Sequence, residues 1–427
     1  MTSTASPLAT LAKESETTFI LALFVDLTGK PCAKLVPVEA VEELAREGVG
    51  FAGYAAGAMG QEPKDPDIMA IPDPASFTPV PFVKEGLALV HCDPHVEGEP
   101  WRFAPRVILR RMIERAAERD LSVYLGAEIE YFLVAKDERG ALVTADPSDS
   151  AARPCYDARG VTRMFDHLAS VSTAMNQLGW GNYANDHEDG NGQFEQNFDY
   201  ADVLTTADRV ITARYLISML AEQRGMTATF MPKPFGDRTG SGLHMHLSLW
   251  KDDEPLFPAA DDPRGSASRS WPTRRSPASS STRAPCRRSS RRPSTPTSAP
   301  ARSRRRRVRR GRRACPPTAA TTAPTWCGCP TATASSCAAA TAPPTHTSRR
   351  PARSARCSTA SSVASTPGAP GGSDDADRAP LPLTLLHAVE ALEADPAVSG
   401  VLDSVGPDVA RYFADLKREE FFTWHSR

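Results

Sequence analysis

A segment of 109 residues, 264–372, limits where this chain of 427 residues can build a folded core. The segment has no Leu, Ile, Met, Phe or Tyr, and no Asp, Glu, Lys, Asn or Gln. Such a composition buries too little apolar surface to offset the conformational entropy lost on folding. We therefore expect order before and after residues 264–372 and low order within them.

The same segment distorts the charge balance of the chain. It contains 22 of the 50 basic residues, all of them Arg, which leaves 28 basic residues against 51 acidic ones in the remainder. An acidic remainder is typical of a soluble enzyme and disfavours nucleic-acid binding. The Arg-rich stretch 302–313 leaves open a protein that binds RNA or DNA through this segment. Against this alternative, the segment interrupts a pattern of strands and helices instead of following it.

A frameshift accounts for the segment better than a binding function does. Residues Thr322–Thr331 read TAPTWCGCPT. Codons that encode this string become, with one base restored ahead of them, codons for the strand-like string NRTHMVRVPD. Ordinary composition returns between Ala369 and Asp374, as a compensating insertion or deletion would produce. We interpret 264–372 as GC-rich DNA translated out of frame, and the sequence leaves open where the shift arose.

Targeting signals and cysteine usage indicate the compartment. Residues 1–17 contain no apolar stretch of the secretory kind, and we expect them to form a flexible N-terminus. No run of about 18 apolar residues occurs in the chain. Outside the unusual segment, the only cysteines are Cys32, Cys92 and Cys155, which are widely separated. These features predict a cytoplasmic protein without membrane spans or a disulfide framework.

The periodicity of apolar residues predicts an α+β fold with two domains. Residues 18–104 form the first, a small β-grasp-like domain with a hairpin over 18–36, a helix over 37–47 and a loop over 48–60. Residues 105–427 form the second, interrupted by 264–372. In the second domain, strands at 121–134, 227–232 and 243–250 alternate with helices at 106–119, 161–178 and 204–224, and helices resume at 381–394 and 409–422.

Two strings place polar side chains in alternation. Side chains two residues apart on a strand share a face. In AEIEYF, at 127–132, Glu128 and Glu130 therefore point together. In GSGLHMHLSLW, at 240–250, His244, His246 and Ser248 share one face. Taken singly, each pair is also typical of the solvated face of a strand.

A third string, NDHEDGNGQFEQNF at 185–198, adds two carboxylates. Glu188 and Glu195 flank the turn signal at 189–192, so a hairpin would bring both to one end of a site. Several ionised carboxylates cannot be buried together without cations, and Mg²⁺ or Mn²⁺ suits oxygen-rich sites. Such ions serve phosphoryl transfer. The chain has no P-loop motif, so a nucleotide would be held in another way.

These strings, together with ATFMPKPF at 228–235, resemble the glutamine synthetase family. FAGYAAGAMGQEPKDPDIMAIPD and CDPHVEGEPWRFAPRVILRR resemble the N-terminal domain and the domain junction of that family. The resemblance covers about 18–263 and 374–427, and the subgroup it points to is the type III glutamate–ammonia ligases, which are similar to γ-glutamylmethylamide synthetases. It implies a catalytic domain built on an antiparallel sheet or partial barrel flanked by helices.

The resemblance also implies an activity and a set of site residues. The family makes glutamine from glutamate, ammonia and ATP through γ-glutamyl phosphate, in ring-shaped homo-oligomers. Methylamine is the alternative amine. Carried over by motif, the residues fall into groups. Glu130, Glu188 and Glu195, which we also name as catalytic, resemble the ligands of one metal, and Glu128 and His244 those of a second. His246, Ser248, Phe198 and Tyr183 resemble nucleotide contacts, and Gly240 resembles a backbone contact to glutamate.

The chain departs from the family pattern in several places. Thr239 stands where many members have Asn, and no residue of 48–61 matches the Asp that helps to deprotonate ammonium. The third ligand of the second metal, a mobile Glu and the Arg residues that hold ATP and glutamate are expected inside 264–372. As written, 333–337 offers no carboxylate. A catalytically inactive remnant of the same fold is therefore a second interpretation.

Overall fold

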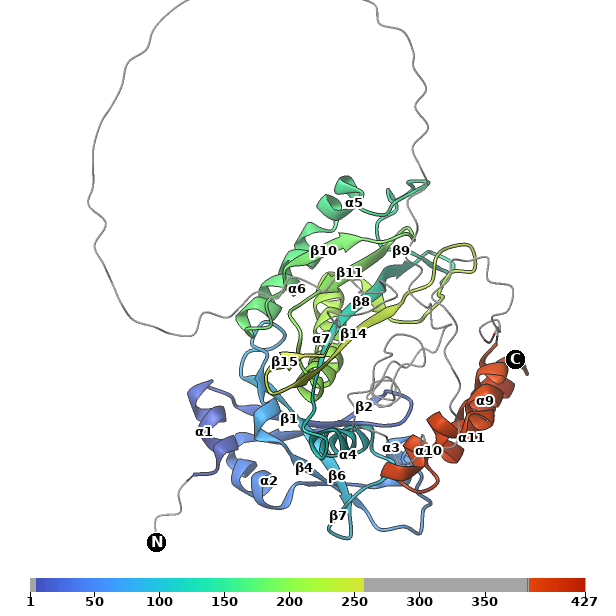
Figure 1. The fold of residues 1–427 in the computed structure, drawn as a ribbon. Helices are drawn as coiled ribbons and strands as arrows, with labels where there is room; N and C mark the ends of the chain where they lie inside the picture. The colour runs from blue at the N-terminus through green and yellow to red at the C-terminus, as the bar shows by residue number, and fades with distance from the viewer. Residues whose placement is uncertain (1–4, 257–381, 383, 427) are drawn as a thin grey trace, which may run out of the picture.

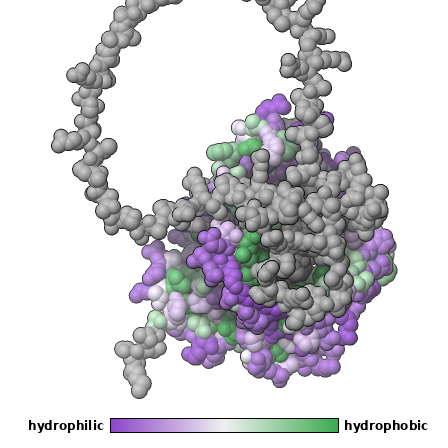
Figure 2. Space-filling model, in the orientation of Figure 1, coloured by the Kyte–Doolittle hydropathy of each residue, from purple (hydrophilic) through white to green (hydrophobic). Residues whose placement is uncertain are grey.

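The computed structural model describes residues 5–256, 382 and 384–426 of this chain. The interpretation of 264–372 as a frameshifted segment falls outside the described residues. Within them, a mixed sheet is followed along the chain by an antiparallel sheet, with helices against both (Figure 1). This arrangement confirms the α+β fold class. In the face drawn in Figure 2, hydrophilic residues predominate, with smaller hydrophobic areas between them.

The first sheet contains the expected hairpin. Asp26 fixes its turn, because Oδ1 of Asp26 accepts hydrogen bonds from the amides of Thr28 and Lys30 at 2.8 and 2.9 Å. The strand order is β2-β1-β6-β4-β3, and β5 and β7 pair with β6. The strands are β1 (Phe19–Val25), β2 (Pro31–Pro37), β3 (Val49–Phe51), β4 (Ile68–Pro72), β5 (Thr78–Pro79), β6 (Leu87–Val96) and β7 (Glu99–Pro100).

Short helices connect and cover these strands. They are η1 (Val38–Ala40), α2 (Val41–Glu47), α3 (Gly53–Ala56) and η2 (Pro74–Ser76). The helix expected over 37–47 is therefore a 3₁₀ turn followed by α2. The loop expected over 48–60 contains β3 and α3, which are too short for the sequence pattern to reveal.

The expectation of a flexible N-terminus over 1–17 is wrong for residues 7–14. Helix α1 (Pro7–Glu14) begins with Pro7, and Oγ of Ser6 caps it by accepting a hydrogen bond from the amide of Ala9 at 3.2 Å. Leu8 and Ala12 are fully buried in the core of the first sheet. Two buried apolar side chains one helical turn apart are enough to hold this short helix against the domain.

The second sheet is built around one long strand, β8 (Ser122–Lys136). The strand order is β10-β11-β8-β14-β15, and β9, β12 and β13 also pair with β8. The other strands are β9 (Leu142–Thr144), β10 (Ala184–His187), β11 (Gln193–Asn197), β12 (Ala201–Asp202), β13 (Thr227–Thr229), β14 (Leu243–Lys251) and β15 (Glu254–Pro255). The hairpin predicted from the 189–192 turn is the β10–β11 pair.

Four helices accompany this sheet: α4 (Pro105–Ala117), α5 (Ala158–Arg163), α6 (Phe165–Gln177) and α7 (Val203–Glu222). The single helix expected over 161–178 is two helices that meet at Met164, where the backbone leaves helical geometry at φ −96° and ψ 14°. Apolar side chains of α6 and α7 pack against Ile129, Tyr131 and Phe194 of the sheet to form the main core.

Three helices follow near the C-terminal end of the described residues: α9 (Leu385–Ala394), α10 (Pro396–Val405) and α11 (Val409–His425). Helix α10 was not expected, although Asp395 caps it through the amides of Ala397 and Val398. Leu402 and Val409 pack in one cluster with Leu27, Ala58 and Ile108, so these helices close a core shared with the β1–β2 turn, the segment after α3 and helix α4. Among the described residues, no helix is long and apolar enough to cross a membrane.

An ion cluster joins the two sheets. The buried guanidinium of Arg106 on α4 donates to Asp73 and Asp93 beside the first sheet, at 2.7 Å each, and to Asp208 on α7 at 2.9 and 3.0 Å. We propose that the division between the two domains lies at 104/105, just before the helix that carries this arginine.

Candidate active site

Strand β8 supplies two carboxylates on one face. Glu128 is half-buried and Glu130 is 7 % exposed. On the opposite face, Ala127, Ile129 and Tyr131 are buried in the main core. The alternation in the sequence follows from this division, because the apolar side chains fix β8 to the helices and leave the carboxylates facing away from them.

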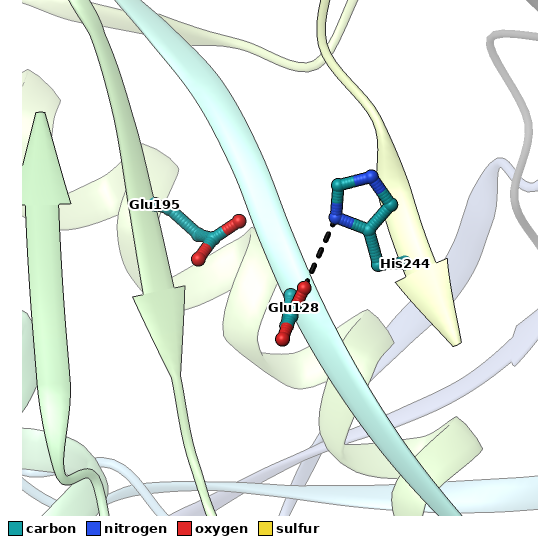
Figure 3. A group of neighbouring side chains, drawn as sticks. All are labelled: Glu128, Glu195 and His244. Atoms are coloured by element: carbon teal, nitrogen blue, oxygen red, sulfur yellow. Dashed lines mark hydrogen bonds and ion pairs between the residues drawn. The ribbon is translucent and has the colours of Figure 1, made fainter. Parts of the chain in front are cut away.

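The neighbouring strands bring further candidate ligands to the same face. Glu195 on β11 lies directly opposite Glu130, and His244 on β14 lies directly opposite Glu128. Asp186 on β10 lies opposite Glu195. Figure 3 shows Glu195, Glu128 and His244 projecting from three adjacent strands. These three residues singled out from the sequence therefore lie together in space, and Asp186 joins them although the sequence patterns did not indicate it.

The turn between β10 and β11 sets the position of Glu188. The amide of Glu188 donates to the carbonyl of Gln193 at 3.0 Å, and the amide of Gln193 donates to the carbonyl of Gly190 at 2.8 Å. Gly192 has φ +82°, a conformation that favours glycine. These contacts close the hairpin so that both of its glutamates face the acidic site.

Two groups of side chains have the spacing of metal ligands. Ligand atoms of Glu128, Glu195 and His244 lie within 4.8 Å of one another, and so do those of Asp186, Glu188 and Glu195. Glu195 belongs to both groups. Glu130 lies beside them, where its Oε2 accepts from the amide of Gly242 at 2.9 Å and from Nε2 of Gln193 at 3.0 Å.

In the first group, two imidazoles contact the carboxylate of Glu128. Nδ1 of His244 and Nε2 of His246 each lie 3.0 Å from a carboxylate oxygen of Glu128. Hydrogen bonds from these two imidazoles lower the pKa of Glu128 to about 2. The hydrogen bond to Glu128 raises the pKa of His244 to about 9. A cation bound through His244 would replace the proton that His244 carries at neutral pH.

The second group shows the electrostatic cost of collecting carboxylates. Burial raises the pKa of Glu188 to about 7, with a further contribution from the charge of Glu130. Burial likewise raises the pKa of Glu195 to about 7, and it raises the pKa values of Glu130 and Asp186. A divalent cation would relieve this cost, because it stabilises the ionised form of each ligand. The oxygen-rich donor set therefore fits a hard cation such as Mg²⁺ or Mn²⁺.

The remaining candidate residues lie around this centre in different environments. His246 is largely exposed and Tyr183 is 47 % exposed, whereas Oγ of Ser248 accepts a hydrogen bond from the indole of Trp250 at 3.0 Å. Phe198 is 2 % exposed and packs against Trp180, with ring centroids 5.9 Å apart. Its ring belongs to the main core in this structure.

Gly240 and Gln193 connect the carboxylates to the chain before β14. A Cβ at Gly240 would lie 2.6 Å from the carbonyl oxygen of Pro232, so the close backbone approach requires glycine. The fully buried side chain of Gln193 donates to the carbonyl of Gly240 at 3.1 Å, and it lies 3.2 Å from Oγ of Ser241. Sequence patterns did not indicate Gln193, because its role depends on contacts with residues far along the chain.

Comparisons with known proteins point to one family. Residues 102–271 match the family model described as "Glutamine synthetase, catalytic domain". A glutamine synthetase of Rhizobium leguminosarum bv. phaseoli is 41 % identical over 60 % of this chain and 57 % of its own length. A glutamate–methylamine ligase of Methyloversatilis universalis is 38 % identical over 60 % of this chain and 58 % of its own.

Solved structures agree with the sequence comparisons. A structure titled "GmaS/ADP complex-Conformation 1" has a TM-score of 0.57 and 44 % identity, and the match covers 60 % of this chain and 58 % of that one. A structure titled "Apo GmaS without ligand" has the same TM-score and identity over 60 % of each chain. The chain thus spans little more than half the length of the relatives that it matches.

Proposed function

We propose that this chain, whose residues 102–271 match the family model of the glutamine synthetase catalytic domain, is an ATP-dependent ligase that joins the γ-carboxylate of glutamate to an amine. The γ-phosphoryl group of ATP would pass to glutamate and give γ-glutamyl phosphate and ADP. Nitrogen of the amine would then attack the γ-carbonyl carbon, and phosphate would leave. Ammonia is the amine that we propose first, so that the product is glutamine.

One observation carries this proposal. Carboxylates from β8, β10 and β11 and an imidazole from β14 converge on one face of the second sheet. Glu128, Glu130, Glu188, Glu195 and His244 are the side chains that we propose as metal ligands, and Asp186 lies among them. A bound Mg²⁺ or Mn²⁺ would neutralise phosphate charge during phosphoryl transfer.

The protein's own groups would perform three tasks around that centre. Glu188 and Glu195 would lose their protons when a cation binds, since burial holds their pKa values at about 7. We propose that His246, Ser248 and Tyr183 contact the nucleotide, and that Phe198 does so only through its backbone. The backbone at Gly240 would contact glutamate, and Gln193 would hold it in place.

Methylamine is the second candidate amine. It is supported by the 38 % identity to a glutamate–methylamine ligase and by the 44 % identity to the structures titled GmaS. Ammonia and methylamine differ by one methyl group, and a pocket discriminates such a difference by about 1–3 kcal/mol. The ratio of kcat/KM for the two amines therefore decides between them.

The test is an assay of the full chain with ATP, glutamate, Mg²⁺ or Mn²⁺, and either amine. We expect phosphate release that requires both glutamate and amine, and mass spectrometry would identify glutamine or γ-glutamylmethylamide as the product. Glu195→Gln should lower kcat at least 100-fold, since losing charge stabilisation in such sites costs about 2.7–4 kcal/mol. Phosphate release without an amide product would contradict the ligase.

An inactive remnant is the other interpretation, and it rests on the composition of 264–372. It predicts that the chain binds Mn²⁺ but turns over neither amine. Sequencing the DNA that encodes Asp262–Asp374 separates the two cases. An uninterrupted frame with ordinary composition would favour the enzyme, whereas two real shifts would favour the remnant. We further propose a cytoplasmic homo-oligomeric ring, which light scattering of the purified protein would test.

A further inference from the structure

The carboxylate of Asp149 lies at the back of the β10–β11 hairpin. Asp149 belongs to the segment between β9 and α5 and is 7 % exposed. Its Oδ2 accepts hydrogen bonds from Nε2 of His187 at 2.8 Å and from the amide of Gly192 at 2.5 Å. Its Oδ1 accepts from Nδ2 of Asn191 at 3.1 Å. One side chain from a separate segment therefore makes three contacts with this hairpin.

These contacts bracket the turn between the two candidate metal ligands. His187 immediately precedes Glu188, and Asn191 and Gly192 lie on the far side of the turn, ahead of Glu195. The other ring nitrogen of His187 lies 2.8 Å from the carbonyl oxygen of Glu188. Asp149 is thus connected through one imidazole to the backbone of Glu188, and directly to the strand that leads to Glu195.

The imidazole in this connection has little freedom to move. His187 is fully buried, and its ring packs against Phe194 with centroids 4.8 Å apart. Gly160 also lies against this ring, since a Cβ there would come within 2.4 Å of Cδ2 of His187. Because the ring is fixed, a shift of Asp149 or of the Glu188 backbone would break one of the two hydrogen bonds of His187. The imidazole therefore keeps these two groups at a set distance.

Asp149 is itself fixed by its own segment. Its amide donates to the carbonyl of Asp146 at 3.1 Å. Oδ1 of Asp146 accepts from the amide of Ser148 at 2.9 Å, and Oδ2 of Asp146 pairs with Arg163 on α5. The segment 146–149 therefore connects α5 to the hairpin, and Asp149 is the residue of this segment that contacts the hairpin by hydrogen bonds.

The hairpin needs such a restraint because the carboxylates that it turns toward the site repel one another. Asp186, Glu188 and Glu195 place ligand oxygens within 4.8 Å of one another. Without a cation, their mutual repulsion favours opening of the turn, whereas binding requires the ligands at fixed spacing. Groups that orient metal ligands from behind keep that spacing and typically contribute 10–100-fold to metal affinity.

We propose that Asp149 is a positioning residue of the metal centre: through His187, Asn191 and Gly192 it holds the hairpin so that Glu188 and Glu195 face β8 at ligand spacing. This inference rests on the proposed function, because it takes these glutamates as metal ligands. Asp149 itself contacts neither substrate nor cation, and its effect is exerted on the geometry of the ligands.

The experiment measures Mn²⁺ affinity of the full chain by electron paramagnetic resonance, together with the melting temperature. In Asp149→Asn, the NH₂ group faces either the donors of His187 and Gly192 or the Nδ2 donor of Asn191, so we expect Mn²⁺ affinity to fall about 10–100-fold. Asp146→Asn is the matched control, since it lies in the same segment, is 8 % exposed and has no hydrogen bond to the hairpin. We expect its Mn²⁺ affinity to stay within about threefold of the parent chain, even where its melting temperature falls equally.

A milder variant covers the case in which Asp149→Asn does not fold. Asn191→Ala removes two hydrogen bonds of Nδ2, to Asp149 and to the carbonyl of Ala151, both 3.1 Å long. We expect about a fivefold loss of affinity, the equivalent of the one hydrogen bond to Asp149. Unchanged affinity in both variants, or equal losses in Asp149→Asn and Asp146→Asn, would overturn the positioning role.

Glu195→Gln separates this inference from the proposed function. If Glu195→Gln retains full Mn²⁺ affinity, the assignment of the ligands is wrong and the inference falls with it. If Glu195→Gln loses Mn²⁺ while Asp149→Asn and Asn191→Ala do not, the ligands stand and only the role of Asp149 is rejected.

Discussion

The side chain of Glu195 belongs to both groups of candidate ligands, so its protonation state affects the whole centre. The groups of this centre differ in the sign of their charge, since an imidazole is cationic when protonated and a carboxylate is anionic when deprotonated. His244 carries an extra proton up to a pKa of about 9, whereas Glu188 and Glu195 retain theirs up to about 7. All three must lose a proton before they can coordinate a cation, so protons and cations compete for the same atoms.

This competition predicts that Mn²⁺ binding strengthens as pH rises from about 6 to about 9. Between pH 7 and pH 8, the proton on His244 alone should give an increase of about tenfold, because one proton is exchanged per cation in that range. Below pH 7 the slope should be steeper, since the two glutamates also release protons. Calorimetry in buffers of different ionisation enthalpy would count the protons released, and affinity that does not change with pH would contradict the prediction.

Individual residues of the site differ in how far the sequence could reveal them. Glu128 and His244 could be found because alternation fixes the face of a strand without knowledge of its neighbours. Asp186 could not, because its strand is hydrophilic throughout and its importance comes from lying opposite Glu195. Asp149 was missed for the same reason, since it acts on residues about 40 positions away. The segment expected to supply further ligands lies outside the described residues.

At the level of elements, β8 explains the architecture of the second sheet. It pairs with β9, β11, β12, β13 and β14, so nearly every strand of that sheet is aligned against one reference. The long strand and the hairpin at 189–192 could be predicted, since each has a strong local pattern. Helices α1 and α10 could not, because each is short and takes its stability from packing against distant residues. The break at Met164 was hidden because apolar residues continue through it.

The β10–β11 turn offers a test at this level, in the paired variants Gly192→Ala and Gly140→Ala. Both glycines have nearly the same backbone conformation, with φ of +82° and +80°. A Cβ at Gly192 would meet Thr144 at 2.8 Å and the carbonyl of Leu133 at 3.2 Å, whereas a Cβ at Gly140 would meet nothing within 4 Å. We expect Gly140→Ala to cost about 1 kcal/mol of unfolding free energy and Gly192→Ala about 1–3 kcal/mol more.

Urea unfolding would measure both free energies. Because the two glycines have nearly the same φ, the difference between the losses reports the steric contacts of the added methyl group at position 192. Equal losses would show that the space around Gly192 adapts to a methyl group. The Mn²⁺ affinity of Gly192→Ala should also fall, because its amide would move away from Asp149.

At the scale of the molecule, a buried cation joins the two sheets. Arg106 binds Asp73, Asp93 and Asp208, and its side chain is 7 % exposed. Arg110 shares Asp73 and Asp93 but is 37 % exposed. The two arginines thus form ion pairs with the same two carboxylates, one from a buried position and the other from a more exposed position.

We expect Arg106→Gln to lower the free energy of unfolding by about 3–5 kcal/mol, because Asp208 loses its arginine partner and Asp73 and Asp93 keep only the more exposed Arg110. Arg110→Gln should cost about 1 kcal/mol or less, since solvent screens its charges. Chemical denaturation of both variants, followed by tryptophan fluorescence, would test the ranking. A larger loss of unfolding free energy in Arg110→Gln would contradict the ranking, since it would mean that the more exposed arginine contributes more to the stability of the cluster.

The cluster that joins Leu27 and Ala58 to the C-terminal helices has a consequence for how the protein is made. The amide of Gly60 donates to the hydroxyl of Tyr412, across a separation of 352 residues. At about 5–20 residues per second, a ribosome needs roughly 20–70 seconds to synthesise that interval. During this time, the apolar surface around Leu27 and Ala58 lacks the helices that cover it in the finished chain. Nascent chains therefore present a site for chaperones until synthesis has passed Tyr412.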